Sequence, residues 1–416
     1  MTETADLIIA GAGLAGLLSL RHLSEKYPTW KIVLLEREEQ IGGRLRSTRD
    51  GNWNCGLQGI GADLFDYVSQ ALSPEDLAQV KRFERAGVMT AQKISDFPFS
   101  QISAAEMARG LGGAAAARDW APVEELFSTV LTDADAPEQA FSQVWKGDRK
   151  SAALVVLEHL GRLWGFPELN SAPGRSLIAR AQQFRRGQWA APWDQLFQRC
   201  LEACGEQLTV ACGSQIMAAR YEAKMWTVAS TRGSFQAQRL LVAQSPWEAI
   251  AWLPKDFWPN SLLNLSSKAK AVSLLVLSDI VSAPCSQLPE VLLIPAEDVQ
   301  VISQGQQIVY QATLNFELTV QAPAVVKAVK RLKRAKKKLH AALPELGPLS
   351  DTDHIALLPV GWAHAASPQE QRWFDKVDAQ AIQKPHLGYC GDSYGGEADS
   401  DRNLMASVEA LRRAWS

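Results

Sequence analysis

Residues 7–20 read LIIAGAGLAGLLSL and decide the fold. The first four residues form a short apolar run that ends at a glycine, which predicts a buried parallel strand. The turn Gly11-x-Gly13-x-x-Gly16 follows, and the apolar residues after it predict a helix. In such a turn the first glycine permits a tight bend, the second lets backbone amides approach a pyrophosphate, and the third lets the helix pack closely on the strand. The stretch therefore predicts a dinucleotide-binding unit, without saying which dinucleotide.

The residues that follow narrow the choice of dinucleotide. A second strand, KIVLLE, ends on Glu36, whose carboxylate can accept hydrogen bonds from an adenosine ribose and would repel a 2′-phosphate. Next come Gly42, Gly43 and Arg44, where glycine permits a close backbone approach and the guanidinium offers two donors to a pyrophosphate. Taken alone, this segment would be an ordinary surface turn. After a βαβ unit it predicts a second phosphate contact, which a nicotinamide dehydrogenase does not need.

A matching block lies at the far end of the chain, in KPHLGYCGDSYGGEADSDRNLMASVEALRRAW. A short strand, 386–390, leads into Gly391 and Asp392, and a helix is expected from about Asn403 onward, with Asp401 or Asn403 as its N-cap. The start of such a helix can stabilise negative charge on a bound group.

With both blocks in view, the sequence resembles the FAD-dependent amine oxidase superfamily, which includes monoamine and amino-acid oxidases, renalase-like proteins and carotene-desaturase-like flavoproteins. The resemblance implies an α/β fold, with a discontinuous (GR2-type) Rossmann-like FAD-binding domain and an inserted α+β substrate domain. It assigns residues 1–75, 186–250 and 356–416 to the FAD-binding domain, and residues 76–185 and 251–355 to the substrate domain.

The resemblance also implies a set of residues around the flavin cofactor. Asp392 matches the ligand of the ribityl chain, the backbone of 403–405 matches the contact to the flavin N1–C2=O edge, and Ile216 matches the backbone group that recognises adenine. Leu404, Met405 and Val408 stand where family members commonly have small residues, so the exact backbone contact is open. The full set of expected FAD contacts is Gly11, Gly13, Leu14, Ala15, Gly16, Glu36, Arg37, Gly42, Gly43, Arg44, Gly56, Gln58, Ile216, Gly391, Asp392, Asn403, Leu404 and Met405.

The same resemblance suggests three catalytic candidates. GWAHAASP, residues 361–368, resembles a strand that places an aromatic side chain beside the flavin, here Trp362, with His364 nearby. A lone histidine is more often a packed or surface residue. Lys270 is the nearest match to a lysine close to flavin N5, with Lys268 as its competitor and an exposed lysine at a strand start as the plain alternative. The function implied is hydride transfer from an amine, or another small and possibly aromatic substrate, to flavin N5, followed by reoxidation by oxygen.

Departures from the family pattern leave other functions open. Asn54 replaces the acid of the strand end that meets the flavin, and no arginine follows it to bind a substrate carboxylate, so an amino-acid substrate is disfavoured. No cysteine stands in an SGGC-like segment, which predicts non-covalent FAD. A desaturase or dehydrogenase of an apolar substrate, and a non-catalytic flavin-binding partner protein, are the alternatives.

Composition excludes several further classes. Of the 416 residues 43 are basic and 45 acidic, a formal charge of −2, which does not favour nucleic acid. Six cysteines without paired CxxC spacing predict free thiols in a reducing compartment, and no metal site is expected. We find neither a signal peptide nor a membrane-spanning run and expect a cytoplasmic protein with a small-molecule substrate, its oligomeric state open.

One strong charge run remains, KAVKRLKRAKKKLHAAL, with its basic residues within 327–340. Apolar residues recur in it at near-helical spacing, so the basic side chains fall on the other face. A solvated helix face is the favoured interpretation, and a contact for an acidic or anionic partner is the alternative.

Overall fold

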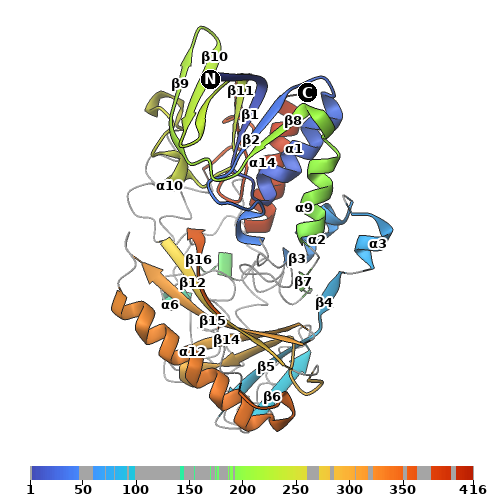
Figure 1. Ribbon diagram of the computed structural model, residues 1–416, viewed down its shortest axis with the longest axis vertical. Helices are drawn as coiled ribbons and strands as arrows, with labels where there is room; N and C mark the ends of the chain where they lie inside the picture. The colour runs from blue at the N-terminus through green and yellow to red at the C-terminus, as the bar shows by residue number, and fades with distance from the viewer. Residues whose placement is uncertain are drawn as a thin grey trace.

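The computed structural model describes residues 2–45, 60–70, 72–78, 80–90, 93–98, 141–144, 154, 169, 174, 176–177, 186, 188–190, 193–259, 271–281, 285–304, 306–316, 322–349, 354–362, 376–394 and 400–415. Figure 1 shows the described elements as two lobes stacked along the long axis, with both chain ends in the upper lobe. Each lobe has its own large sheet, and a small third sheet lies between them.

Within the described residues, seven strands form the upper sheet, in the order β8-β2-β1-β11-β10-β9 with β17 beside β11. The β8, β2, β1, β11 and β17 pairings are parallel, and β9, β10 and β11 form an antiparallel meander. The expected α/β, Rossmann-like architecture is confirmed. The strands are β1 (Thr2–Ala10), β2 (Ile32–Leu35), β8 (Leu208–Ala211), β9 (Ile216–Glu222), β10 (Met225–Ser230), β11 (Gly233–Val242) and β17 (Leu387–Tyr389).

Both faces of this sheet are covered, which explains the continuous apolar run in β1. Leu7 and Ile9 pack into the core on the helical side, while Ile8 and Ala10 pack into the core on the opposite side. A parallel strand buried on both faces needs apolar residues at every position. The helices that pack on the first core are α1 (Leu14–Lys26), α2 (Ala62–Ser69), α9 (Trp193–Glu202) and α14 (Ser400–Ala414).

Two element boundaries differ from the sequence-based expectation. Strand β1 begins at Thr2 because the polar residues 2–5 pair with Ser234–Ala237 of β11, a partner that local sequence does not reveal. Helix α14 begins at Ser400, so Asp401 lies in its first turn and is not its N-cap.

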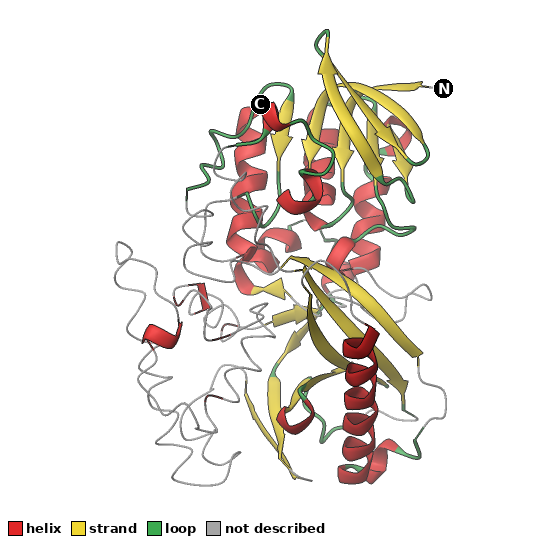
Figure 2. Ribbon diagram, turned by 90° about the vertical axis from the view of Figure 1, so that its left-hand side faces the viewer, coloured by secondary structure: helices red, strands yellow, loops and turns green. Residues whose placement is uncertain are grey.

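The lower sheet has the order β16-β12-β15-β14-β13-β5-β6 in the described chain. Helix α12 (Ala322–Ala342) packs along one face of it through Ala328, Leu332, Ala335 and Leu339, at helical spacing (Figure 2). The strands are β5 (Arg85–Thr90), β6 (Lys93–Pro98), β12 (Ala271–Ile280), β13 (Val291–Ile294), β14 (Val299–Gln304), β15 (Gln307–Phe316) and β16 (His354–Trp362).

Three short strands form the third sheet, and the other elements of the described chain are short helices. Strand β7 (Gln188–Ala190) pairs with both β3 (Ile60–Gly61) and β4 (Lys81–Phe83) in the third sheet. The remaining elements are η1 (Gly43–Leu45), α3 (Pro74–Leu77), α6 (Phe141–Val144), η5 (Gly205–Gln207), α10 (Pro246–Ala249), η6 (Lys255–Phe257), η7 (Pro295–Glu297) and η8 (Pro344–Leu346). None of the helices within the described ranges is long and apolar enough to cross a membrane.

Two segments pack with a different sheet from the one that the expected domain limits assign to them. Strand β16, which the expected limit at residue 356 divides, pairs with β12 and so belongs to the lower sheet. Trp252, Leu253 and Trp258, beyond the expected limit at residue 250, pack in the second core of the upper sheet. In both cases packing partners far away in the chain decide the placement. The domain limits themselves stay a prediction.

A buried charge cluster fixes α12 on the lower sheet. Asp279 of β12 accepts hydrogen bonds from His340 (2.8 Å) and Lys336 (3.1 Å), and all three side chains are buried. The hydrogen bond with Asp279 raises the pKa of His340, more than burial lowers it. Burial would raise the pKa of Asp279, but the bonds from His340 and Lys336 hold it below its ordinary value. The charged form of the cluster is therefore the stable one.

This cluster predicts a pH-dependent stability. Because the pKa of His340 is raised in the folded state, its contribution is complete below about pH 6.5 and is lost as the pH rises through the raised pKa. We expect H340Q to lower the free energy of unfolding by about 1–3 kcal/mol at pH 6 and by less at pH 8. Urea titrations at both pH values measure it. The control is H354Q, at an exposed position on β16, and an equal effect of H340Q at both pH values would contradict the assignment.

Candidate functional site

The upper sheet ends in a backbone cradle at the start of α1. Gly13 is the N-cap of α1 and offers no side-chain cap, so the amides of Leu14, Ala15 and Gly16 begin the helix as free donors. Gly13 also forms an isolated parallel bridge with Gly42, whose N–H donates to the Ala12 carbonyl at 2.7 Å. The two glycine segments singled out in the sequence therefore lie side by side, with the helix N-terminus between them.

Three glycines here differ in how much space surrounds them. A Cβ on Gly16 would lie 2.0 Å from the Gly11 carbonyl oxygen, so helix and turn are in backbone contact. Gly43 has a φ of +56°, and its Cβ would come within 3.0 Å of the Gly13 Cα. A Cβ on Gly13 would meet nothing closer than 3.9 Å. Gly16 and Gly43 are therefore needed by the protein itself, whereas Gly13 leaves open space.

Glu36 closes the cradle on the β2 side. Its carboxylate accepts the backbone N–H groups of Ala12 (2.9 Å) and Glu38 (3.0 Å), and only 9% of the residue is exposed. Burial raises the pKa of Glu36, although the two backbone donors act in the opposite direction. The turn after β1 is thereby bonded to the end of β2, and the carboxylate lies where the sequence predicts the ribose contact.

Arg44 and Asp392 come from opposite ends of the chain, 348 positions apart, and form an ion pair. Arg44 belongs to η1, directly after the second glycine segment, and Asp392 follows β17. The pair brings the expected pyrophosphate contact and the expected ribityl contact to one place. The Arg44 side chain is 42% exposed and remains accessible to a ligand.

The turn that carries Asp392 is held by α14. Gly391, at a φ of +141°, donates its N–H to the Ser407 hydroxyl at 2.8 Å, and the same hydroxyl lies 3.0 Å from the Gly391 carbonyl oxygen. Tyr394 donates to the backbone carbonyl of Gln244, beyond β11, at 2.9 Å. Ser407 is fully buried, so it positions the turn and does not act as a surface group.

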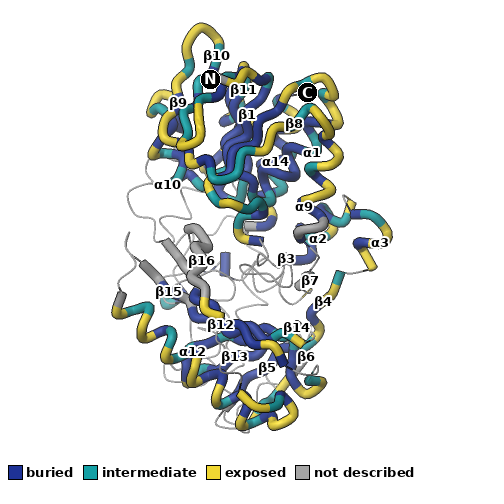
Figure 3. Tube along the Cα trace, in the orientation of Figure 1, coloured by how far each residue is buried: buried dark blue, intermediate teal, exposed yellow. Residues whose placement is uncertain are grey.

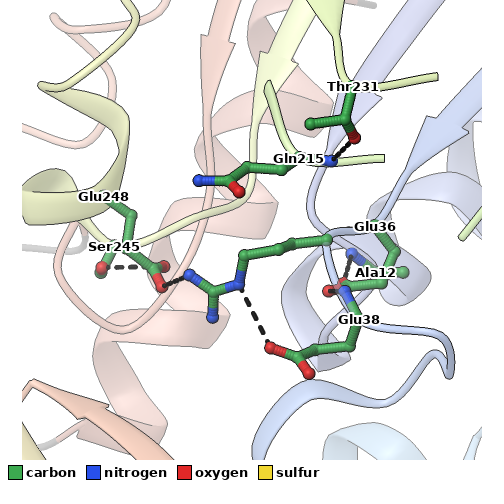
Figure 4. A network of polar contacts seen from close by, with 8 residues as sticks. Ala12, Glu36, Glu38, Gln215, Thr231, Ser245 and Glu248 are labelled. Carbon is green, nitrogen blue, oxygen red and sulfur yellow. Dashed lines mark hydrogen bonds and ion pairs between the residues drawn. The ribbon is translucent and has the colours of Figure 1, made fainter. Parts of the chain in front are cut away.

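Next to Glu36, three charged side chains form a network that we call the rim of the cradle: Arg37, Glu38 and Glu248 (Figure 4). Arg37 contacts Glu38 and, across the rim, Glu248 of α10, each at 3.2 Å. Ser245 donates to the Glu248 carboxylate at 3.1 Å. Ile216 is buried at the start of β9, close to the chain after β2, because the Ser214 N–H donates to the Glu36 carbonyl at 2.7 Å. The expected adenine end is therefore assembled from two segments that the sequence separates widely.

The first turn of α14 contacts the segment before α2. Asp401, which is 4% exposed, accepts the backbone N–H of Gly61 at 2.9 Å. Leu404 is buried in the first core, and Met405 is partly buried and packs against it. Because these side chains fill space in the core, the helix accommodates residues larger than those of the family pattern.

One of the catalytic candidates, Trp362, lies at an end of the lower sheet. Trp362 is the last residue of β16 and pairs in register with Ala271, the first residue of β12, which directly follows Lys270. Strand β16 also contacts η1, the turn that carries Arg44. Figure 1 shows β16 pointing from the lower lobe toward the upper one. Lys270 itself, its competitor Lys268, His364, and the expected contacts Gly56 and Gln58 with Asn54 lie outside the described residues.

Five of the six cysteines lie in the described chain. Cys200, Cys204 and Cys390 are free and buried, and Cys212 and Cys285 are free and partly buried. Within the described ranges no three His, Cys, Asp or Glu side chains are grouped as a metal site would need.

Comparison with known proteins supports this geometry. Residues 9–85 match the family described as NAD(P)-binding Rossmann-like domain. Wild-type putrescine oxidase bound to putrescine superposes with a TM-score of 0.68 at 13% identity, covering 100% of this chain and 99% of its own. Cyclohexylamine oxidase from Brevibacterium oxydans gives a TM-score of 0.66 at 13% identity, covering 99% and 97%. The chain has the fold of the FAD-dependent amine oxidases.

The curated relatives match only a short part of the chain. The FAD-containing monooxygenase EthA of Mycolicibacterium smegmatis is 46% identical over 43 residues, which is 10% of this chain and 9% of that protein. Uncharacterized protein R188 of Acanthamoeba polyphaga mimivirus is 40% identical over 47 residues, 11% of this chain and 9% of that protein. The matched part therefore spans less than a tenth of the length of these relatives.

Sequence reasoning missed three residues that position the segments around the cradle. Glu248 opposite Arg37, Ser407 under Gly391 and Asp401 at Gly61 all act through contacts between distant segments. Only Asp401 carried a local signal, as an acidic residue near a helix start.

The glycine geometry predicts that two similar substitutions act differently. G16A should lower the free energy of unfolding by about 1–3 kcal/mol, because its Cβ would overlap backbone. G13A should leave the apoprotein as stable as wild type and weaken FAD binding about tenfold or more, because its Cβ enters the open space of the cradle. Thermal unfolding of apoprotein and FAD titration separate the two. Equal loss of apoprotein stability in both variants would refute this division.

The Arg44–Asp392 pair predicts a ligand effect without a large stability effect. R44Q should weaken FAD binding about 10- to 100-fold, because a charge-assisted contact to the pyrophosphate is lost. Its effect on unfolding should stay within about 1 kcal/mol, as for other exposed ion pairs. The matched control is R21Q, which breaks the exposed Arg21–Glu25 pair on α1 and should bind FAD as wild type does. Fluorescence titration with FAD measures both, and unchanged affinity in R44Q would remove Arg44 from the site.

Proposed function

We propose that this protein is an FAD-dependent oxidoreductase of the amine oxidase type. The observation that carries the proposal is the cradle at the start of α1, where free helix amides, Glu36 and the Arg44–Asp392 pair converge. The lower sheet, joined to η1 through β16, adds the second half of the amine oxidase fold.

The residues present fit the dinucleotide part of FAD. Free N–H groups at the α1 N-terminus and the Arg44 guanidinium suit the two negative charges of a pyrophosphate. The open space above Gly13 admits a phosphate close to the backbone, and the buried Glu36 carboxylate suits the ribose hydroxyls. Arg37, Gly42, Gly43 and Ile216 line the same groove in this assignment, and Leu14, Ala15 and Gly16 contribute their amides.

The flavin end is assigned to the carboxyl-terminal block. Asp392 would hold the ribityl chain, and the backbone of Asn403, Leu404 and Met405 in the first turns of α14 would face the ring edge. Gly391 permits the turn, and Ser407 keeps it in place. Gly56 and Gln58 complete the expected set from the segment before β3.

Non-covalent binding is proposed from the state of Cys390. Its side chain is fully buried, accepts a hydrogen bond from Ser19 of α1 at 3.4 Å, and has a pKa raised to about 12 by burial. Thiolate is the nucleophilic form, and a buried thiol facing the core cannot supply it.

In this proposal, FAD accepts the hydride and three residues of the chain act around the substrate. Bound FAD would supply the hydride acceptor at N5 and transfer electrons onward to oxygen. Trp362 would wall the substrate position from the end of β16, and Lys270, which precedes β12 in the sequence, would hold a water or a proton near the substrate. His364 is the third candidate, two residues beyond β16. A small amine or aromatic substrate fits this assignment, whereas a substrate carboxylate finds no arginine in the expected position.

We place this activity in the cytoplasm, because the five cysteines of the described chain are free thiols. The proposed partner is a small-molecule substrate and not nucleic acid, in line with the charge of −2.

The proposal is tested by anaerobic mixing of the FAD-loaded protein with amines, amino acids, reduced nicotinamides and apolar dehydrogenation substrates. We expect amines to bleach the oxidised-flavin absorbance after anaerobic mixing, and we expect the admission of air to restore it. W362A should slow the bleaching at least about tenfold and leave FAD affinity unchanged, because it changes the substrate wall and not the cradle.

The other outcomes decide between the alternatives. Bleaching by apolar substrates alone, without recovery in air, would replace the proposal with a desaturase or dehydrogenase. A yellow protein that only dithionite reduces would support a non-catalytic flavin protein. A protein that takes up no FAD would overturn the cofactor assignment. The R21Q variant serves as the matched control for turnover.

A further inference from the structure

Two glutamines meet in the lower sheet with unused hydrogen-bond donors. Gln300 of β14 and Gln311 of β15 are directly opposite each other in the antiparallel register. In both side chains the amide nitrogen Nε2 is buried and has no hydrogen-bond partner in the described chain. Gln311 is only 6% exposed, so bulk water does not serve it. A buried donor without a partner is costly in a folded protein, and two such donors side by side call for a common acceptor.

The pair lies on the face of the lower sheet that is turned away from α12. Along the two strands, the neighbours Val301 and Tyr310 pack into the core beneath α12. Because successive side chains of a strand point to opposite faces, Gln300 and Gln311 lie on the other face. Figure 2 shows α12 along one side of the sheet, and Figure 3 shows the middle of the sheet as buried. The Cβ atoms of directly opposite residues are about 4.5–5.5 Å apart, so one small group can reach both amides.

The surroundings of the pair are apolar and uncharged. Val276 of β12 is opposite Gln311, and Leu293 of β13 is opposite Gln300. Both are buried, as is Val88 of β5 opposite Leu293. In the described chain this row therefore offers no carboxylate to a buried ammonium and no cation to a buried carboxylate. A neutral oxygen, such as that of an amide carbonyl, is the acceptor that suits two amide donors here.

The pair is set back from the end of the sheet that carries Trp362. That residue is opposite Ala271, whereas Gln311 is opposite Val276, five residues further along β12. At about 3.3 Å per residue, the two positions are about 17 Å apart along the strand. A group bound at the pair is therefore far from the proposed reacting end of a substrate, and only an elongated substrate can reach both.

We propose that Gln300 and Gln311 form a distal subsite that binds a neutral oxygen of the substrate, such as the carbonyl of an acylated far end. The inference rests on the proposed function and deepens it, because it specifies the substrate as an elongated amine with an oxygen acceptor remote from the amine. Each Nε2 donates to that oxygen, whose two lone pairs accept both bonds. A substrate without the oxygen leaves both donors unpaired, so the subsite selects against it.

The test uses the FAD-loaded full chain and mono-N-acetylated α,ω-diaminoalkanes of increasing chain length. In anaerobic mixing, we expect the rate of flavin bleaching to pass through a maximum with chain length. At this maximum the rate should be about 100-fold higher than with an alkylamine of equal length. In Q311L the ratio should fall to about threefold or less, because leucine keeps a similar volume and removes the donor. The unacetylated diamine should react as slowly as the alkylamine, because the row offers its second ammonium no carboxylate.

Two further readouts do not depend on turnover. Q311L should unfold at or above the wild-type temperature, because the Gln311 Nε2 has no partner in the ligand-free protein. An N-alkylacetamide has the acceptor but no amine to oxidise, and it should bind wild type in a calorimetric titration and Q311L about tenfold more weakly. The matched control is Q236L on β11 of the upper sheet, where the Gln236 amide donates to Thr227 at 3.2 Å. Q236L should be less stable than wild type and should keep the wild-type selectivity.

The inference is overturned if wild type reacts equally fast with acetylated and plain amines, since a buried water would then be the partner of the pair. Preference for the unacetylated diamine, or unchanged selectivity in Q311L, would overturn it as well. If FAD is taken up and no amine of any kind bleaches it, the proposed function is rejected instead. The N-alkylacetamide titration then still decides whether the two glutamines bind an oxygen.

Discussion

Close backbone approach at the start of α1 is the constraint on which the rest of the structure depends. Helix and turn touch through Gly16 and Gly11, and the second glycine segment lies against Gly13. Side chains cannot enter these contacts, so the helix amides stay unpaired and point into one small space. The parallel strands, the position of Glu36 and the meeting of Arg44 with Asp392 all follow from keeping that space open and electropositive.

The charged side chains described above lie beside side chains of opposite charge. At the cradle, Arg44 offsets Asp392, and Arg37 contacts both Glu38 and Glu248, so each of these bases faces at least one acid. In the lower lobe, Asp279 is paired with Lys336 and His340 inside the protein. Arg331 of α12 pairs with Asp298, and Arg334 and Lys338 pair with Glu297.

The two lobes are joined at the places where the proposed chemistry requires them to be joined. Strand β16 runs from the lower sheet to η1, and Asp401 binds the segment that enters α2. The distant solved structures share this fold at low identity, because a fold depends on backbone contacts and buried volume more than on particular side chains.

The sequence by itself determined the βαβ unit, the glycine cradle, the charged rim residue Glu36 and the Gly391–Asp392 turn, because each is encoded by neighbours along the chain. It also predicted a helix over the charge run within 327–340, from hydrophobic periodicity. Tertiary structure alone decided the early start of β1, the register of Ala271 with Trp362, and the pairing of Arg44 with Asp392 across 348 positions. These features depend on which distant segments meet, and no local pattern records that.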